Sequence, residues 1–184
     1  MTEIFAAWKR TRDIVMIALT AAIYASTLIP FKPIQIVPGL TELRPASVIP
    51  VLFGILFGPA AAWGSAIGNL IADFFGMLTP ASVFGFLANF FFSYTAFKLW
   101  RALTRKITLD AKHIAIFVLC GVSSSLVCAL IVGLGVQILG FAPFRVLFLV
   151  VFINNALMSG ILGPVLMKLL YERVKKMGLL YEKT

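Results

Sequence analysis

Apolar residues fill six stretches of this chain, and short polar or proline-containing segments separate them. The stretches cover residues 13–30, 46–58, 60–76, 81–100, 113–139 and 144–170. Runs of this length and apolarity predict helices that cross a lipid bilayer. The open question is whether residues 46–76 form one helix or two.

Residues 46–76 are too long for one ordinary membrane span, and Gly58-Pro59 interrupts them. Glycine and proline both break helices, so this pair predicts a boundary between two elements. Two helices of about 14–16 residues would each reach only about 21–24 Å, less than the usual thickness of about 30 Å. Length alone therefore leaves the number of spans undecided.

The placement of the basic residues decides between one helix and two. Most of the 16 Lys and Arg residues fall in three clusters, which are Lys9, Arg10 and Arg12; Lys98, Arg101, Arg105, Lys106 and Lys112; and Lys168, Arg173, Lys175, Lys176 and Lys183. One span over 46–76 would leave two clusters outside, against the positive-inside rule, whereas two spans or a re-entrant pair place all three inside. We therefore predict an all-α integral membrane protein, a compact single domain over residues 1–184 with six transmembrane helices and both termini cytoplasmic.

Composition supports the prediction of a membrane protein and argues against other classes of protein. A net charge of +9 would suggest a nucleic-acid partner in a soluble protein. Here the mean hydropathy is +1.02, so the basic clusters are better explained as cytoplasmic anchors. The sequence contains no phosphate-binding loop, no His-Glu-x-x-His and no metal-spaced Cys/His cluster. We therefore expect neither an enzyme nor a cofactor or metal.

Polar residues in and beside the predicted spans gather toward the outer side. Each is costly in a bilayer without a partner or water, so together they predict a ligand pocket. The predicted pocket residues are Glu42, Arg44, Asn69, Asp73, Asn89 and Asn154, with Gln35 on a gate formed by the proline-containing loop 31–45. Simpler interpretations remain open, namely an interfacial ion pair for Glu42 and Arg44 and interhelical hydrogen bonds for the asparagines. The predicted aromatic walls are Phe31, Trp63, Phe74, Phe75, Phe84, Phe86, Phe90 and Phe144.

Small residues recur at intervals of four on the first predicted helix, at Ala18, Ala22 and Ser26. Such spacing makes a flat strip on which another helix can approach closely. The spacing is compatible with two interpretations, namely packing inside the bundle and docking of another membrane subunit.

The stretch from Arg44 to Gly76, RPASVIPVLFGILFGPAAAWGSAIGNLIADFFG, resembles the substrate-binding S components of energy-coupling factor (ECF) transporters. Ala18-x-x-x-Ala22 also matches the small-residue motif by which such components meet their transmembrane coupling subunit. The size, the six-helix layout and the basic ends extend the resemblance over the whole chain, while the motifs cover the first three helices.

This resemblance implies a high-affinity binder of a vitamin or related organic micronutrient in a prokaryotic cytoplasmic membrane. S components work with a coupling subunit and two cytoplasmic ATPases, and they are thought to topple in the membrane while the loop between their first two helices gates the site. Ala18 and Ala22 are accordingly expected to contact the coupling subunit. The substrate stays open, with cobalamin and a queuosine precursor among the candidates.

Two other functions remain compatible with the sequence. A self-sufficient ion-coupled carrier would use Asp73 as a proton or cation site, although such carriers often have two related halves and no internal repeat is evident here. A membrane scaffold subunit would bind no small molecule at all.

Overall fold

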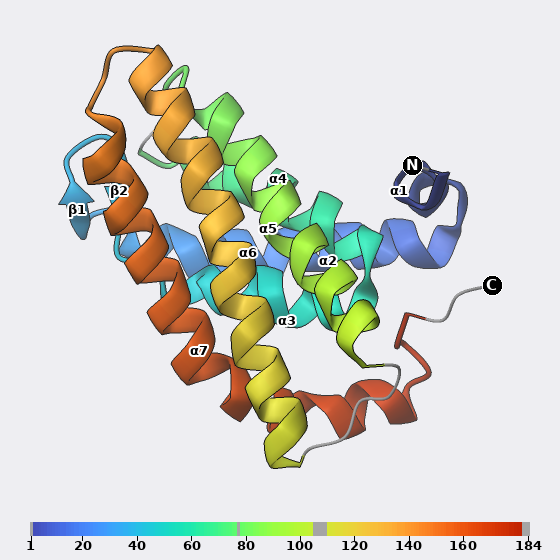
Figure 1. The fold of residues 1–184 in the computed structure, drawn as a ribbon. Helices are drawn as coiled ribbons and strands as arrows, with labels where there is room; N and C mark the ends of the chain where they lie inside the picture. The colour runs from blue at the N-terminus through green and yellow to red at the C-terminus, as the bar shows by residue number, and fades with distance from the viewer. Residues whose placement is uncertain (1, 77, 105–109, 182–184) are drawn as a thin grey trace.

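The computed structural model describes residues 2–76, 78–104 and 110–181, and helices dominate these ranges (Figure 1). The α-helices are α1 (Thr2–Ala6), α2 (Thr11–Leu28), α3 (Val48–Phe57), α4 (Pro59–Asp73), α5 (Ser82–Leu103), α6 (Ala111–Ile138) and α7 (Phe144–Lys176). Short 3-10 turns occupy Ala7–Lys9, Ile29–Phe31 and Pro45–Ser47. The six predicted apolar stretches correspond to α2–α7, so the all-α class is confirmed.

Three helical segments are by themselves long and apolar enough to cross a membrane: Thr11–Phe31, Ala111–Ile138 and Phe144–Lys176. Helices α3 and α4 are shorter, with 10 and 15 residues. At 1.5 Å per residue they reach about 15 Å and 22 Å, less than the hydrocarbon layer. The chain is thus a multi-pass membrane protein, and six complete crossings remain a prediction.

The boundary predicted at Gly58-Pro59 is present, and it separates α3 from α4. Gly58 has φ +63°, a value that side chains disfavour, and a Cβ there would meet the Tyr181 ring at 2.8 Å. Pro59 opens α4, where its missing N–H costs nothing. The sharp turn lets two short apolar helices share the centre of the bundle.

Helices α2 and α4 approach closely because α4 presents glycines to α2. A Cβ at Gly64 would lie 2.5 Å from Thr20 Cβ, and one at Gly68 would lie 2.8 Å from the Ala21 carbonyl oxygen. Small residues at such a crossing allow backbone-to-backbone packing. The face of α2 that carries Thr20 and Ala21 is therefore committed to the interior.

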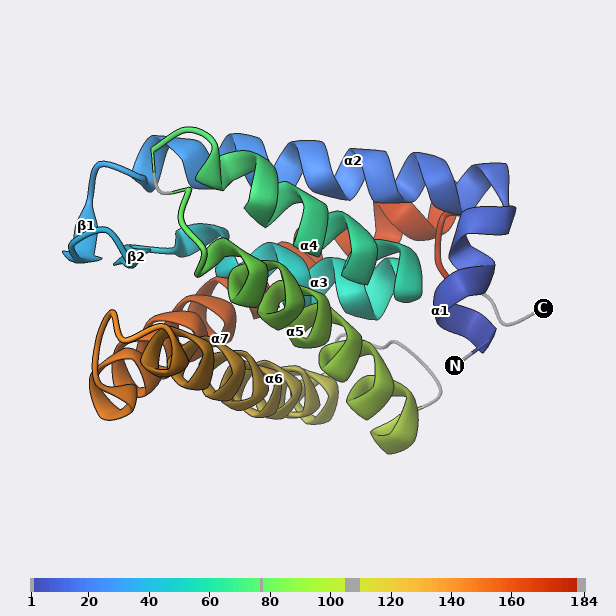
Figure 2. The same cartoon turned by 90° about the horizontal axis from the view of Figure 1, so that it is seen from above.

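The bundle has two distinct ends (Figure 2). At one end lie the α4–α5 and α6–α7 connections and an antiparallel hairpin of β1 (Gln35–Val37) and β2 (Thr41–Glu42). At the other end lie α1, the α3–α4 turn and the start of α6. The described members of the three basic clusters belong to this second end, while Arg105, Lys106 and Lys183 lie outside the described residues.

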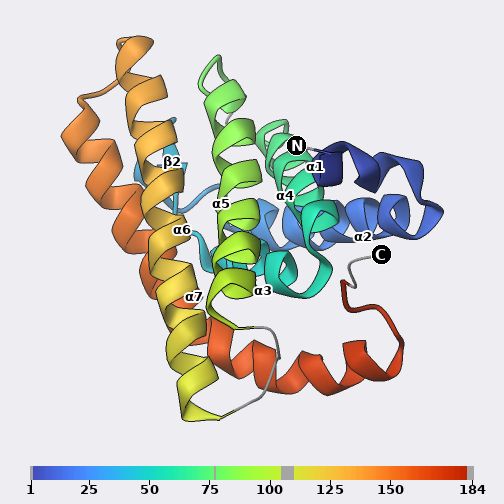
Figure 3. The same ribbon diagram turned by 45° about the vertical axis from the view of Figure 1, so that its right-hand side comes forward.

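The hairpin lies within the proline-containing loop 31–45 that the sequence predicted as a gate. Gly39 turns the chain with φ +71°, and the Leu43 N–H donates to the Ile34 carbonyl at 2.9 Å across the hairpin. Figure 3 shows α7 lying along α6 and then bending beneath α3. Pro164 inside α7 removes one helical hydrogen bond and accounts for the bend.

Candidate functional site

A cavity lies beneath the hairpin, where the loop meets the ends of four helices. Its volume is about 40 Å³, which is room for a few water molecules. It is lined by Lys32, Gly39, Leu40, Thr41, Glu42 and Arg44 of the loop, Asn69 and Asp73 of α4, Thr79, Ala81, Ser82 and Gly85 near the start of α5, and Val132, Val136 and Val151 of α6 and α7. One side is therefore polar and the other aliphatic.

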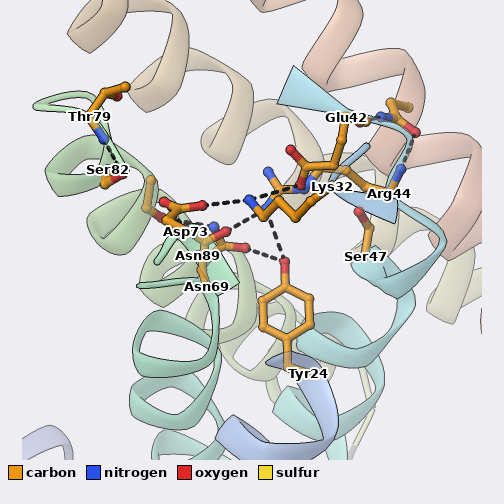
Figure 4. A network of polar contacts seen from close by, with 12 residues as sticks. Tyr24, Lys32, Glu42, Arg44, Ser47, Asn69, Asp73, Thr79, Ser82 and Asn89 are labelled. Atoms are coloured by element: carbon orange, nitrogen blue, oxygen red, sulfur yellow. Dashed lines mark hydrogen bonds and ion pairs between the residues drawn. The ribbon is translucent and has the colours of Figure 1, made fainter. Parts of the chain in front are cut away.

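Five polar side chains form a closed ring beside this cavity (Figure 4). Lys32 Nζ donates to Asp73 Oδ1 at 2.6 Å, and Asn69 Nδ2 donates to Asp73 Oδ2 at 3.3 Å. Arg44 Nη2 donates to Asn69 Oδ1 at 2.5 Å. Glu42 Oε1 closes the ring, 3.3 Å from Arg44 Nε and 3.6 Å from Lys32 Nζ. The ring joins the loop to α4.

All four charged members of the ring are buried. Their exposed fractions are 4% for Lys32, 2% for Glu42, 6% for Arg44 and 7% for Asp73. Charges removed from water need close partners, since an unpaired buried charge costs several kcal/mol. The two cations and two carboxylates give a net charge of zero, which lowers the free-energy cost of burying them.

A second set of side chains supports Arg44 from below. The Tyr24 hydroxyl lies 3.4 Å from Arg44 Nη2 and donates to Asn89 Oδ1 at 2.7 Å. Asn89 Nδ2 in turn donates to the Gly85 carbonyl at 2.8 Å. The guanidinium is thus held from α2 and α4 at once, while Asn89 of α5 orients the tyrosine.

Asparagines of α7 hold the loop itself. Asn154 Nδ2 donates to the Glu42 carbonyl at 2.9 Å, and its Oδ1 accepts from the Arg44 backbone N–H at 3.3 Å. Ser47 Oγ donates to Asn155 Oδ1 at 2.6 Å. These contacts fix the backbone from which two ring residues project.

The predicted pocket residues thus fall into three groups. Glu42, Arg44, Asn69 and Asp73 meet around the cavity. Asn89 and Asn154 lie behind them, where they support Tyr24 and the loop backbone. Gln35 is exposed in the hairpin, where its Oε1 accepts from the Gly39 N–H at 2.8 Å, so it does not join the others. Whether any of these residues contacts a substrate stays a prediction.

The predicted aromatic walls are wrong for this cavity, because none of the eight proposed residues lines it. Phe74 and Phe75 are 67% and 62% exposed. Trp63 instead packs against Trp8 and Phe90, with ring centroids 5.6 Å and 4.9 Å apart. The apolar lining consists of small and aliphatic residues, and aromatic side chains serve the core and the outer surface.

Lys32, Tyr24 and Thr41 also belong to the site, although the sequence did not predict them. Lys32 carried a usable signal, since it is one of the few basic residues outside the three clusters. Tyr24 and Thr41 carried none, because a tyrosine in an apolar helix and a threonine in a loop are both ordinary. Thr41 is 2% exposed, lines the cavity and has no hydrogen-bond partner for its hydroxyl among the described residues.

Ala18 and Ala22 lie on the exposed face of α2. They do not pack inside the bundle, where Thr20, Ala21 and Tyr24 meet α4 and the core. The internal-packing interpretation of these two alanines is therefore wrong. Together with exposed Ser26 they form a smooth strip along the outside of the helix.

An apolar helical bundle with a polar, loop-covered cavity near one end is the architecture expected of a membrane transport protein. A family model described as "QueT transporter" matches residues 14–172. The chain belongs to the QueT transporter family, a family of ECF-type S components. This confirms the resemblance noted in the sequence. No curated protein and no solved structure matches the chain.

Proposed function

We propose that this protein is the substrate-binding subunit of an ECF-type importer that captures a queuosine precursor from outside. A transmembrane coupling subunit and two cytoplasmic ATPases then complete delivery to the inside. The observation that carries the proposal is the buried polar ring, which lies at the end away from the basic clusters and beneath a loop. Family membership favours a queuosine precursor over cobalamin, because QueT transporters are S components for queuosine precursors.

The ring has the functional groups that a queuosine precursor requires. Such precursors are guanine-like deazapurine bases, whose edge offers two neighbouring N–H donors beside a carbonyl acceptor. Arg44 and Asn69 can donate to the carbonyl of such a base, and the carboxylates of Asp73 and Glu42 can accept from donors that the substrate carries. Aliphatic Val132, Val136 and Val151 supply the apolar side of the cavity.

The cavity must enlarge before a base can enter, because about 40 Å³ holds water but not a bicyclic ring. We expect the covering loop to move, since polar contacts join its charged residues to α4 and its backbone to α7, while Val37 and Leu40 are its apolar contacts with the core. Loop opening admits the substrate, and reclosure excludes water from the polar contacts. This agrees with the gating role that the resemblance implies.

Mass spectrometry of small molecules that co-purify with the detergent-extracted protein tests the substrate. We expect a deazaguanine base with the wild type and with Arg145→Met, which alters an exposed cation at the same end of the bundle. Arg44→Met should lose the base. Recovery of an unrelated compound would contradict the proposal. So would the absence of binding when the purified protein is assayed with queuosine precursors.

The exposed strip of Ala18 and Ala22 is the proposed docking surface for the coupling subunit. Replacing either residue with Trp should abolish uptake by the whole transporter while leaving binding to the isolated protein unchanged. Leu149→Trp, at a residue of α7 that is 52% exposed, is the matched control. Equal loss of uptake and binding would instead point to damage to the bundle.

Two alternative functions make different predictions for the same preparations. An ion-coupled carrier would accumulate substrate in vesicles that contain this protein alone and an ion gradient. A scaffold subunit would bind no small molecule in any preparation. Accumulation without partner subunits would therefore overturn the proposed dependence on a coupling module.

A further inference from the structure

Lys32 occupies an unusual position in the ring, because both carboxylates face its ammonium group. Its Nζ lies 2.6 Å from Asp73 Oδ1 and 3.6 Å from Glu42 Oε1. The side chain is 4% exposed and lines the cavity. Lys32 directly follows the turn that ends α2, whereas Glu42 stands at the far end of the loop. The ammonium therefore joins the beginning of the loop, its end and α4.

The two cations of the ring are held in different ways. Arg44 contacts Asn69, Tyr24 and Glu42, and its own backbone N–H is bonded to Asn154. The described polar partners of Lys32 Nζ are the two carboxylates. A guanidinium is a rigid planar fork, whereas a lysine ammonium is a point charge on a flexible four-carbon stem. Lys32 is thus the cation that can leave without dismantling the rest of the ring.

Charge balance limits what can replace Lys32. If its ammonium leaves, Glu42 and Asp73 face Arg44 alone, and a buried site acquires a net charge of −1. Such an uncompensated charge is costly, so departure requires a positive group in the vacated place. Glu42 Oε1 has no hydrogen-bond partner of good geometry among the described residues, which leaves acceptor capacity for an incoming donor.

We propose that Lys32 is an internal stand-in for a cationic amine on the substrate. The substrate's ammonium displaces the Lys32 ammonium from Asp73 and Glu42, and the released lysine frees the beginning of the loop. Lys32 is then a specificity-determining residue: a base with an amino arm can make the exchange, and the same base without the arm cannot. This inference rests on the proposed function, because it takes the cavity as the substrate site.

Two probes and one variant test the exchange. The probes are 7-aminomethyl-7-deazaguanine, which is protonated at neutral pH, and uncharged 7-deazaguanine. Because Lys32→Ala removes the internal competitor, we expect its affinity for the charged base to rise about tenfold or more, with no such rise for the neutral base. Arg145→Ala, at an exposed outer cation, should change neither affinity.

The opposite result is equally distinct. If Lys32→Ala weakens binding of both bases to the same extent, Lys32 holds the substrate directly and the exchange is wrong. A rise in affinity for both bases would also overturn the charge argument, because loss of the ammonium would then act by making space.

A second measurement tests Lys32 without reference to either base. Lys32→Ala removes one positive charge and three carbons from a buried site. Propylammonium matches both the charge and the shape of the missing group, whereas 1-propanol matches its shape alone. We expect propylammonium to raise the Tm of Lys32→Ala saturably, with no comparable rise for 1-propanol or for Arg145→Ala. Equal or absent stabilisation by the two compounds would overturn the inference.

The two measurements separate the two proposals. If the wild type binds neither base while propylammonium stabilises Lys32→Ala, the proposed substrate is wrong and the cation site stands. If the wild type binds a deazaguanine base and Lys32→Ala lacks both effects, the proposed function stands and the role of Lys32 falls.

Discussion

At the hairpin end of the bundle the four charged side chains of the ring are between 2% and 7% exposed. At the opposite end, the basic residues Lys168, Arg173, Lys175 and Lys176 of α7 are all exposed. The first set is paired across elements far apart in the sequence. The second set follows one helix and faces outward.

Of these two sets, only the buried charges are placed to recognise a ligand. Exposed charges are screened by salt and hold no fixed geometry, so they anchor the protein at a membrane surface without recognising anything in particular. Buried charges persist only with matched partners at defined positions. We therefore expect ligand recognition at the hairpin end, where the few charges are buried. The net charge of +9 comes mostly from the opposite end.

The largest expected effect is that of Arg44→Met. Loss of the guanidinium leaves Glu42 with Lys32 alone and leaves Asn69 without its donor, so we expect a loss of about 3–5 kcal/mol in the free energy of unfolding. Ligand affinity should fall by about 100-fold or more. Arg145→Met, exposed at the same end, should stay within about 0.5 kcal/mol of the wild type. Unfolding in mild detergent and equilibrium binding measure both, and similar losses in the two variants would erase the contrast between buried and exposed charge.

An intermediate effect is expected from Asn154→Ala, which removes both hydrogen bonds from α7 to the loop backbone. The buried Glu42 carbonyl loses its partner, so we expect a cost of about 1–3 kcal/mol in stability. Affinity should fall mainly through faster ligand release, because the loop no longer closes firmly. Stopped-flow dissociation measures this rate. Gln137→Ala, which removes an amide that accepts from the Phe144 N–H at an exposed site, is the control and should leave the rate unchanged.

The smallest expected effect concerns an ion pair at the opposite end. Glu3 of α1 pairs with Lys98 of α5, and the hydrogen bond from Lys98 lowers the pKa of Glu3 below its ordinary value of 4.5. A lowered folded-state pKa means that the pair stabilises the protein above pH 4.5 and that this contribution is lost as the pH falls through the lowered pKa.

We expect this contribution to be about 0.2–1 kcal/mol, because Lys98 is half exposed. Glu3→Gln should remove the acid-dependent step in the fluorescence of Trp8 and Trp63, whose rings lie 5.6 Å apart at this junction. A step of the same size in Glu3→Gln would show that another group titrates there.

The helices were predictable because the apolar pattern of the sequence directly reflects burial and contact with lipid. Gly58-Pro59 marked the α3–α4 boundary for the same local reason. Helix α1 and strands β1 and β2 were not predicted, since their formation depends on contacts with residues far away in the sequence. The Trp63 indole N–H, for example, donates to the Ile4 carbonyl at 3.0 Å.

The candidate site was predictable in part. Asn69 and Asp73 stand out because polar groups in an apolar helix need a reason to be there. Lys32 was not predicted although it lies outside the three basic clusters, because a charged loop residue is ordinarily solvated. The sequence marked Asn154 as polar, but only the fold reveals that its partner is the loop backbone. The prediction of aromatic walls was wrong for this cavity, because a phenylalanine side chain can face lipid, the core or a pocket equally well.

Both described ends of the chain are fastened to helices at the end opposite the hairpin. Besides the Ile4 contact, the Tyr181 N–H donates to the Leu56 carbonyl at 2.7 Å, and Arg12 Nη2 donates to the Leu180 carbonyl at 2.8 Å. An affinity tag fused at either end can therefore disturb α2, α3 or α4. Its effect on binding is checked against the same protein after the tag has been cleaved off. A fluorescent reporter is better attached at Phe141, which is 46% exposed in the α6–α7 connection. From that position it follows the orientation of the bundle while leaving the fastened ends undisturbed.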